Sequence, residues 1–179
     1  MLDWNVVISV QERGYRQAKA VLERYGEVSE TEYFNVLVMK VGDIRQFLGD
    51  MRKLNEEEPQ SLDGISRIVP VTATFFFQSP EEFEIRARGA VVRWVSALAG
   101  KTFHVRMHRR GFKARLSSQE EERFLDHFLM KCLEERGFTA EISFEDPDVI
   151  IALETIGQRA GLSLWPREER QRYLFLRMD

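Results

Sequence analysis

The sequence predicts an α+β protein of two modules, residues 1–74 and residues 75–179. Two observations support this division. The first module alternates β-branched runs with segments of helical periodicity, whereas the second mixes them in an irregular order. Strong turn and helix-cap signals gather between the two parts, around Ser79. With 179 residues, the chain is long enough to bury a core in either one domain or two small ones.

In the first module the predicted order is strand, helix, strand, helix, strand. The predicted helices have apolar residues three and four apart, and Asp43 is the expected N-cap of the second helix. This order is that of a ferredoxin-like fold without its last helix. The elements are expected at Val6–Val10, Gly14–Tyr25, Phe34–Val41, residues 44–54 and Ile65–Thr74.

In the second module the first helix has the clearest signal. Ser79 is its predicted N-cap, Pro80 takes the first helical position and Glu82 completes a capping box, while Gly100 ends the helical segment. A second helix is expected from Ser118, with Ser118 and Glu121 as its capping box. The other predictions are strands at Thr102–His108, Ile142–Phe144, Val149–Ile156 and Leu162–Trp165, turns at 146–148 and 157–161, and a last helix from Pro166.

Positive charge is concentrated in residues 101–115, although the whole chain has a formal net charge of −3. Phe103, Val105 and Met107 alternate with polar residues, which is typical of a half-buried strand. The chain then leaves the strand at Arg109 and opens a helix near Ser118. Loop cations, free backbone N–H groups and a helix dipole favour anion binding there. The alternative is an edge strand with ordinary solvated charge.

No other pattern indicates a catalytic, metal or membrane site. The chain lacks phosphate-binding glycine loops and any recognisable set of residues for nucleophilic or acid–base catalysis. Its single cysteine, Cys132, excludes an internal disulfide and is expected in the core. His104 and His108 flank Arg106, so we interpret them as surface histidines facing an anion, not metal ligands. No secretory signal or membrane-spanning run is evident, so we expect a cytoplasmic protein. Because no motif for a cofactor or metal is found, we expect neither.

Several segments resemble the THUMP domain in the order that the family shows. They are Arg67–Val71, Thr102–Gly111, Ile142–Glu154 with its Asp-Pro-Asp turn, and Gly161–Leu164. The resemblance covers the second half well, whereas the first 64 residues match in pattern only. Asp146-Pro147 stands where the tRNA-binding adaptors of this family usually have Asn-Pro, and either Asn or Asp can cap the turn.

The resemblance implies a ferredoxin-like module followed by a THUMP module that binds tRNA, typically through its acceptor end. Most family members carry a fused enzyme, but this chain ends at Asp179 without one. It looks closest to the stand-alone adaptor that presents tRNA to a cytidine acetyltransferase. We therefore expect a tRNA-binding protein that is not itself an enzyme and that works with a separate RNA-modifying enzyme.

The predicted RNA-binding residues are the cations of the basic stretch, which would hold phosphates, and two histidines that could donate hydrogen bonds to phosphate or ribose. A weaker candidate lies at the joint between the modules. These residues are Lys101, His104, Arg106, His108, Arg109, Arg110, Lys113, Arg115 and Arg67. Substitutions at Arg109 and Arg110 are expected to leave folding almost unchanged. Two alternatives remain: a small RNA-modifying enzyme with an unrecognised site, and a ligand-sensing or oligomerising ferredoxin-like protein.

Overall fold

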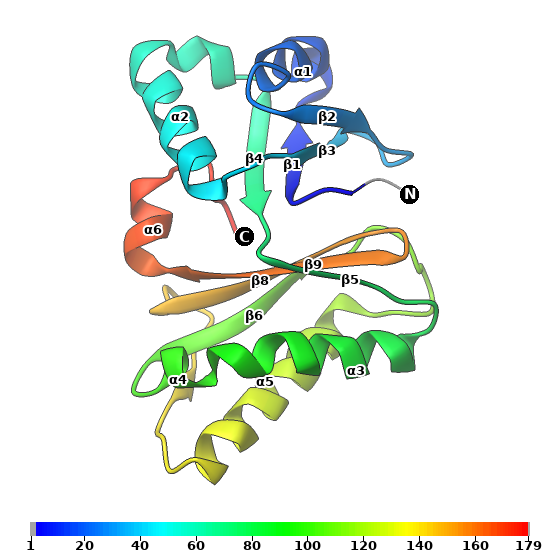
Figure 1. Cartoon of the computed structure of the whole chain (residues 1–179). Coiled ribbons are helices and arrows are strands. Elements are labelled where there is room, and N and C mark those ends of the chain that lie inside the picture. Colours follow the sequence, from blue (N-terminus) through cyan, green and yellow to red (C-terminus); the bar gives the residue numbers. More distant parts are fainter. Residues whose placement is uncertain (1–2, 179) are drawn as a thin grey trace. The chain divides into compact units, whose positions relative to one another are not determined.

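The computed structural model describes residues 3–178 and divides the chain into two compact units (Figure 1). The first unit is Met1–Val71 with Arg170–Arg177, and the second is Thr72–Glu169 with Met178–Asp179. The division therefore falls after Val71, and a segment near the C-terminus returns to the first unit. Residues 1, 2 and 179, which the predicted module limits include, lie outside the described residues.

The first unit is a four-stranded antiparallel sheet with two helices. Its strands lie in the order β2-β3-β1-β4, so β1 sits between β3 and β4. This β-α-β-β-α-β arrangement confirms the ferredoxin-like prediction. Its elements are β1 (Val6–Val10), η1 (Glu12–Gly14), α1 (Tyr15–Leu22), β2 (Glu27–Glu30), β3 (Val36–Lys40), α2 (Ile44–Glu57), η2 (Pro59–Leu62) and β4 (Ile65–Pro70).

The sequence prediction missed β2 in this unit. Glu27 and Glu30 are exposed at the edge of the sheet, and the strand pairs with β3 on one side only. Edge strands tolerate charged residues, which made this segment look like a loop. In contrast, the expected cap of α2 is confirmed, because the Asp43 carboxylate accepts a hydrogen bond from the Gln46 backbone N–H at 3.0 Å.

One core holds the first unit together. Both α1 and α2 pack on the same face of the sheet, where Ile8, Leu22 and Met51 are among the fully buried residues. Phe175, from the returning segment, packs against this core, and its carbonyl oxygen accepts a hydrogen bond from the Ile68 N–H at 3.0 Å. The returning segment thus lies along β4 and belongs to the first fold.

The second unit is a five-stranded mixed sheet with strand order β5-β9-β8-β6-β7. β5, β6, β7 and β8 run in one direction, because β9 is antiparallel to β5 and β8, and the other pairs are parallel. The elements are β5 (Ala73–Phe76), α3 (Pro80–Val91), η3 (Val92–Trp94), α4 (Val95–Leu98), β6 (Thr102–His108), α5 (Ser118–Glu135), β7 (Glu141–Ile142), β8 (Val149–Ile156), β9 (Arg159–Pro166) and α6 (Arg167–Arg172), whose last three residues fall in the first unit.

The helix starts of this unit follow local sequence chemistry. The Ser79 hydroxyl accepts a hydrogen bond from the Glu82 N–H at 3.2 Å, as predicted, and the Glu82 carboxylate accepts one from Gln78 at 2.9 Å. The cap of α5 is Ser117, one residue earlier than predicted. Glu121 is therefore not the capping partner; it is turned into the interior and is 6% exposed.

Helices α3 and α5 cover one face of the second sheet (Figure 1). Phe103, Val105 and Met107 of β6 face these helices, as their alternation predicts. Cys132 lies at the margin of this core and is partly buried. The predicted strand Ile65–Thr74 is split between the two sheets, because the chain passes from one unit to the other after Val71. Within residues 3–178, no helix is both long and apolar enough to cross a membrane.

Candidate nucleic-acid interface

Three strands of the second unit end at the same edge of their sheet. β5, β6 and β8 run in one direction, so the segments that follow them meet beyond their carboxyl ends. Hydrogen bonds join these segments: the Phe77 N–H donates to the Gln158 carbonyl at 3.0 Å, and the Gly157 N–H donates to the Arg110 carbonyl at 2.9 Å. Helices α3 and α5 also begin here, so the basic segment lies beside two helix N-termini.

Residues 109–117, which we call the basic loop, form a compact turn. Phe112 and Ala114 have positive φ angles of 52° and 65°, and the Phe112 carbonyl accepts hydrogen bonds from Arg115 and Leu116, both at 3.0 Å. The Phe112 ring lies 4.9 Å from the ring of Phe77, and Leu116 is buried. These apolar anchors fix the loop.

Two cations of the basic loop point to solvent. Lys113 and Arg115 are exposed, between the two apolar anchors of the loop. The guanidinium of Arg115 lies 4.9 Å from the centre of the Phe112 ring, which restricts where its charge can be. These two side chains are therefore held on a rigid support and remain accessible to an anion.

Arg110 has a structural partner that the sequence did not reveal. Its Nη1 lies 2.6 Å from Oε2 of Glu154, a carboxylate on β8 with no exposed surface, and His108 Nδ1 lies 3.4 Å from the other oxygen. The Arg110 N–H also donates to the Thr155 hydroxyl at 2.9 Å. Arg110 is therefore not the ordinary surface residue on which the expectation of unchanged folding rested, because it is paired with a buried carboxylate.

The remaining predicted cations lack the combination that Lys113 and Arg115 share, namely exposure and a place on the basic loop. Arg109 donates from Nη1 to the Gly111 carbonyl and is partly buried. Arg106 is partly buried on β6, and Lys101 is exposed before the other end of that strand, about 20 Å or more from the basic loop at 3.3 Å per residue. Arg67 is buried on β4 of the first unit.

His104 is an interior residue, so the expectation that it lies at the surface is wrong. Only 6% of its surface is exposed, its Nδ1 lies 2.7 Å from the Ser143 carbonyl oxygen, and its ring is 5.3 Å from that of Phe144. These contacts occupy the imidazole within the fold. Within residues 3–178, no group of three or more His, Cys, Asp or Glu side chains is arranged to hold a metal ion.

Acidic side chains of α5 cover the part of β6 that β7 leaves unpaired. β7 pairs only with the first two residues of β6. Beyond them, the Val105 N–H donates to Asp126 at 2.8 Å and the Met107 N–H donates to Glu122 at 2.7 Å. Burial raises the pKa of Asp126 to about 7, against the opposing effect of the Val105 hydrogen bond. The helix thus completes the strand edge with carboxyl groups that sequence reasoning did not single out.

Glu121 is a second buried carboxyl group on α5. Burial, and to a smaller extent the charges of Glu84 and Glu120, raise its pKa to about 7. Its Oε2 is buried and has no hydrogen-bond partner among the described residues. Glu154 could have been suspected from the sequence, because it is the one charged residue in the apolar run of β8, whereas Glu121 looked like an ordinary first-turn acid.

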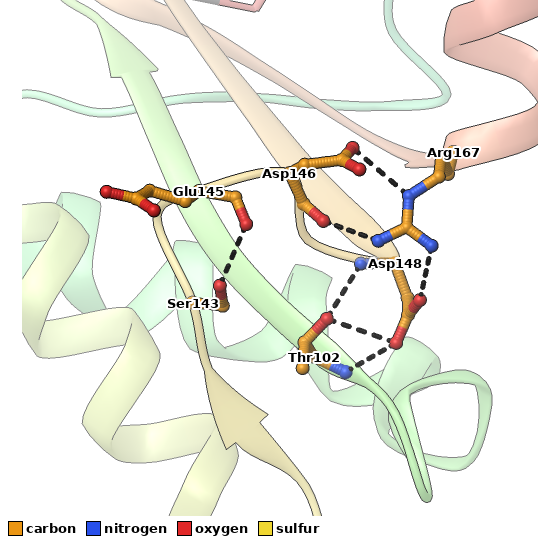
Figure 2. Close-up of polar contacts among 6 residues, drawn as sticks. All are labelled: Thr102, Ser143, Glu145, Asp146, Asp148 and Arg167. Atoms are coloured by element: carbon orange, nitrogen blue, oxygen red, sulfur yellow. Dashed lines mark hydrogen bonds and ion pairs between the residues drawn. The ribbon is translucent and has the colours of Figure 1, made fainter.

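The Asp-Pro-Asp turn, which carried much of the family resemblance, is a structural clamp (Figure 2). Arg167 donates from Nε to Asp146 at 3.1 Å and from Nη1 to Asp148 at 2.9 Å. The other oxygen of Asp148 accepts hydrogen bonds from the Thr102 N–H at 2.9 Å and hydroxyl at 3.0 Å. Hydrogen bonds from Thr102, then the charge of Arg167, hold the pKa of Asp148 below its usual range.

This clamp also accounts for the unusual backbone of the turn. Asp146 has a positive φ of 43°, a conformation that Asp tolerates better than most residues. On the adjoining segment, the Ser143 hydroxyl donates to the Glu145 carbonyl at 3.1 Å (Figure 2). The turn therefore joins the amino ends of β6 and β8, at the edge opposite the basic loop.

No protein-family model and no curated protein matches the chain, but solved structures do. PH1313 from Pyrococcus horikoshii Ot3 has a TM-score of 0.59 at 15% identity, over 92% of this chain and 55% of that one. TrmN from Thermus thermophilus has a TM-score of 0.55 at 18% sequence identity, and the match covers 93% of this chain and 47% of TrmN. A 4-thiouridine synthetase, solved as an RNA complex with bound ATP, has a TM-score of 0.57 at 13% sequence identity. That match covers 92% of this chain and 42% of the synthetase chain.

These likenesses show the fold. The chain is an α+β protein with a ferredoxin-like unit followed by a THUMP-like mixed unit, as the sequence predicted. It spans about half the length, or less, of each structure described above. The fold shared with this chain therefore makes up only part of those longer proteins.

The expectation that the protein is not an enzyme is corrected by the same neighbours. They include the 4-thiouridine synthetase and a predicted N6-adenine-specific DNA methylase from Listeria monocytogenes, which has a TM-score of 0.54 at 12% identity over 90% of this chain. This fold thus occurs within proteins described as enzymes. The lack of a familiar motif in the sequence was not sufficient reason to exclude a catalytic role.

Proposed function

We propose that the protein binds tRNA through the carboxyl edge of its second unit and takes part in RNA modification. The observation that carries this proposal is the placement of Lys113 and Arg115. Both are exposed on a loop fixed by Phe112 and Leu116, where α3 and α5 begin. Exposed cations on a rigid support bind phosphates at a small entropic cost, because the support is already ordered.

Within this proposal, the protein positions the acceptor end of tRNA for an RNA-modifying catalytic centre, such as that of a cytidine acetyltransferase in a separate cytoplasmic protein. Phosphate contacts give affinity and register but no base identity. The structure of the 4-thiouridine synthetase–RNA complex, whose fold this chain shares in part, supports a role for this fold next to RNA. The partly buried Arg109 of the loop and Arg106 of β6 would add positive charge, and His108 Nδ1 lies 3.4 Å from Glu154.

The test is a titration of tRNA over a salt series with the variant Lys113→Ala/Arg115→Ala. Each lost phosphate contact should lower the log–log salt slope by about 0.7 to 0.9, so the double variant should lose about 1.4 to 1.8 and bind more weakly. The matched control is Lys53→Ala/Lys131→Ala, which removes two exposed lysines elsewhere. Equal slopes for wild type and the loop variant would contradict the proposal.

A second measurement addresses the acceptor end. Wild-type protein should bind intact tRNA more tightly than tRNA whose single-stranded 3′ nucleotides have been removed. If intact and trimmed tRNA bind equally while the salt slope still depends on the basic loop, the protein binds a part of the tRNA other than its 3′ end. The acceptor-end part of the proposal would then be wrong.

A further inference from the structure

The first unit contains a pocket of about 320 Å³, and no residue of the basic loop is among the described residues that line it. It opens between the start of β4, the end of α2, η2 and the returning C-terminal segment. Its apolar lining includes Leu62, Ile65, Leu174 and Phe175. Leu174 is 68% exposed, which is unusual for a large apolar side chain. The volume is at the lower end of the range for small-molecule sites.

The walls of this pocket are held in place. The Gln11 N–H donates to the Gly64 carbonyl at 2.8 Å, and Gly14 packs so closely on Gly64 that a Cβ atom on Gly14 would lie 2.3 Å from the Gly64 Cα. On the other side, Phe175 accepts the hydrogen bond from Ile68 on β4. Backbone contacts thus tie both sides of the pocket to the fold of the first unit.

Five polar side chains line the pocket: Gln11, Asn55, Asp63, Ser66 and Arg177. Among the residues that the structure describes, none of these side chains has a hydrogen bond or ion pair with another side chain or with the backbone. Two amides, a carboxylate, a hydroxyl and a guanidinium thus offer both donors and acceptors in one small space. A ligand that uses them must itself carry closely spaced donors and acceptors.

A nucleobase has these properties: a flat apolar face and a polar edge on which donors and acceptors alternate. Its face suits Leu174 and Phe175, and amide side chains such as Asn55 pair with base edges. Asp63 can only accept hydrogen bonds when ionised, so it favours a base with an exocyclic amino group, which adenine, cytosine and guanine carry and uracil does not. Among the described residues that line the pocket, Arg177 supplies the one positive charge, which suits a phosphate.

We propose that this pocket binds one unpaired nucleotide that carries an amino-bearing base, supplied by the single-stranded end of the tRNA. This inference rests on the proposed function, because it assigns the RNA end to the first unit. The same chemistry would accept a free nucleotide, so the experiment includes both sources. A pocket of this volume fits one nucleotide and not a longer segment of RNA.

The experiment uses the full chain and the variants Leu174→Ala and Asp63→Asn. Their matched controls are Ile85→Ala, which removes another exposed aliphatic side chain, and Glu57→Gln, which removes a neighbouring negative charge. We expect each pocket variant to bind intact tRNA about tenfold more weakly than wild type, equivalent to about 1.4 kcal/mol. The controls should bind as wild type does, and tRNA trimmed at its 3′ end should not distinguish the variants from wild type.

A second arm titrates CMP, AMP and UMP while backbone amide resonances are followed by NMR. Shifts at pocket residues with CMP or AMP, and weaker shifts with UMP, are expected. If intact tRNA binds all variants equally and no nucleotide shifts these resonances, the inference about the pocket is overturned. In that case, a salt slope that still depends on Lys113 and Arg115 supports the proposed function independently. If tRNA does not bind but CMP shifts the pocket, the proposed function fails and the pocket takes a free nucleotide.

Discussion

Replacing Arg110 by methionine should strongly destabilise the second unit. Glu154 has no exposed surface, and it is paired with the Arg110 guanidinium, which is 2.6 Å away and itself 15% exposed. Removing one partner of a buried ion pair typically costs about 3–5 kcal/mol, because the other charge remains desolvated. For a chain of this size, about 2–4 °C per kcal/mol converts this cost into a melting temperature lowered by about 6–20 °C.

Circular dichroism during thermal and urea unfolding measures this effect. The control is Lys113→Met, a nearby exposed position where the change should stay within about 0.5 kcal/mol. The double variant Arg110→Met/Glu154→Leu removes both charges and should recover most of the stability, since apolar residues of similar volume often replace a buried pair without loss. A wild-type melting temperature for Arg110→Met alone would show that the pair does not support the fold.

Three other predictions follow from particular hydrogen bonds and carboxyl groups. The pKa values of about 7 for Asp126 and Glu121 lie above the values near 4 in the unfolded state, so the folded state keeps protons that the unfolded state releases. The free energy of unfolding should therefore fall as the pH rises from about 4 to about 7, by up to about 1.4 kcal/mol per pH unit for each group. Asp126→Asn should reduce this slope in urea unfolding, and an unchanged slope would contradict the assignment. Asp148→Ala should cost about 1–3 kcal/mol, because Thr102 loses its acceptor; urea unfolding that matches wild type would mean the clamp is dispensable. Ser79→Ala should cost about 1 kcal/mol through loss of the α3 cap, and a midpoint unchanged from wild type would argue against that cap.

Local chemistry allowed several features to be predicted from the sequence. The caps at Asp43 and Ser79 depend on residues three positions apart, so a short window of sequence contains everything that forms them. The alternation in β6 and the apolar run of β8 likewise predicted which side chains enter the core. Fold class followed from the order of such elements.

Features that depend on distant pairing were decided only by the tertiary structure. β2 has a polar sequence and becomes a strand because β3 offers it hydrogen bonds. The run from residue 65 to residue 74 was predicted as one strand that Pro70 limits to an edge or a bend, yet its parts pair in different sheets, since the partners β1 and β9 lie far away in the chain. Periodicity records the faces of a segment but not the identity of its neighbours.

The candidate site divides in the same way. The sequence by itself determined that positive charge is concentrated before a helix, and the structure places Lys113 and Arg115 in the open at that point. It could not show that Arg110 neutralises Glu154, 44 residues away, or that His104 bonds the backbone of Ser143. The charge of a side chain is a local property, whereas its burial and its partner are set by segments that only folding brings together.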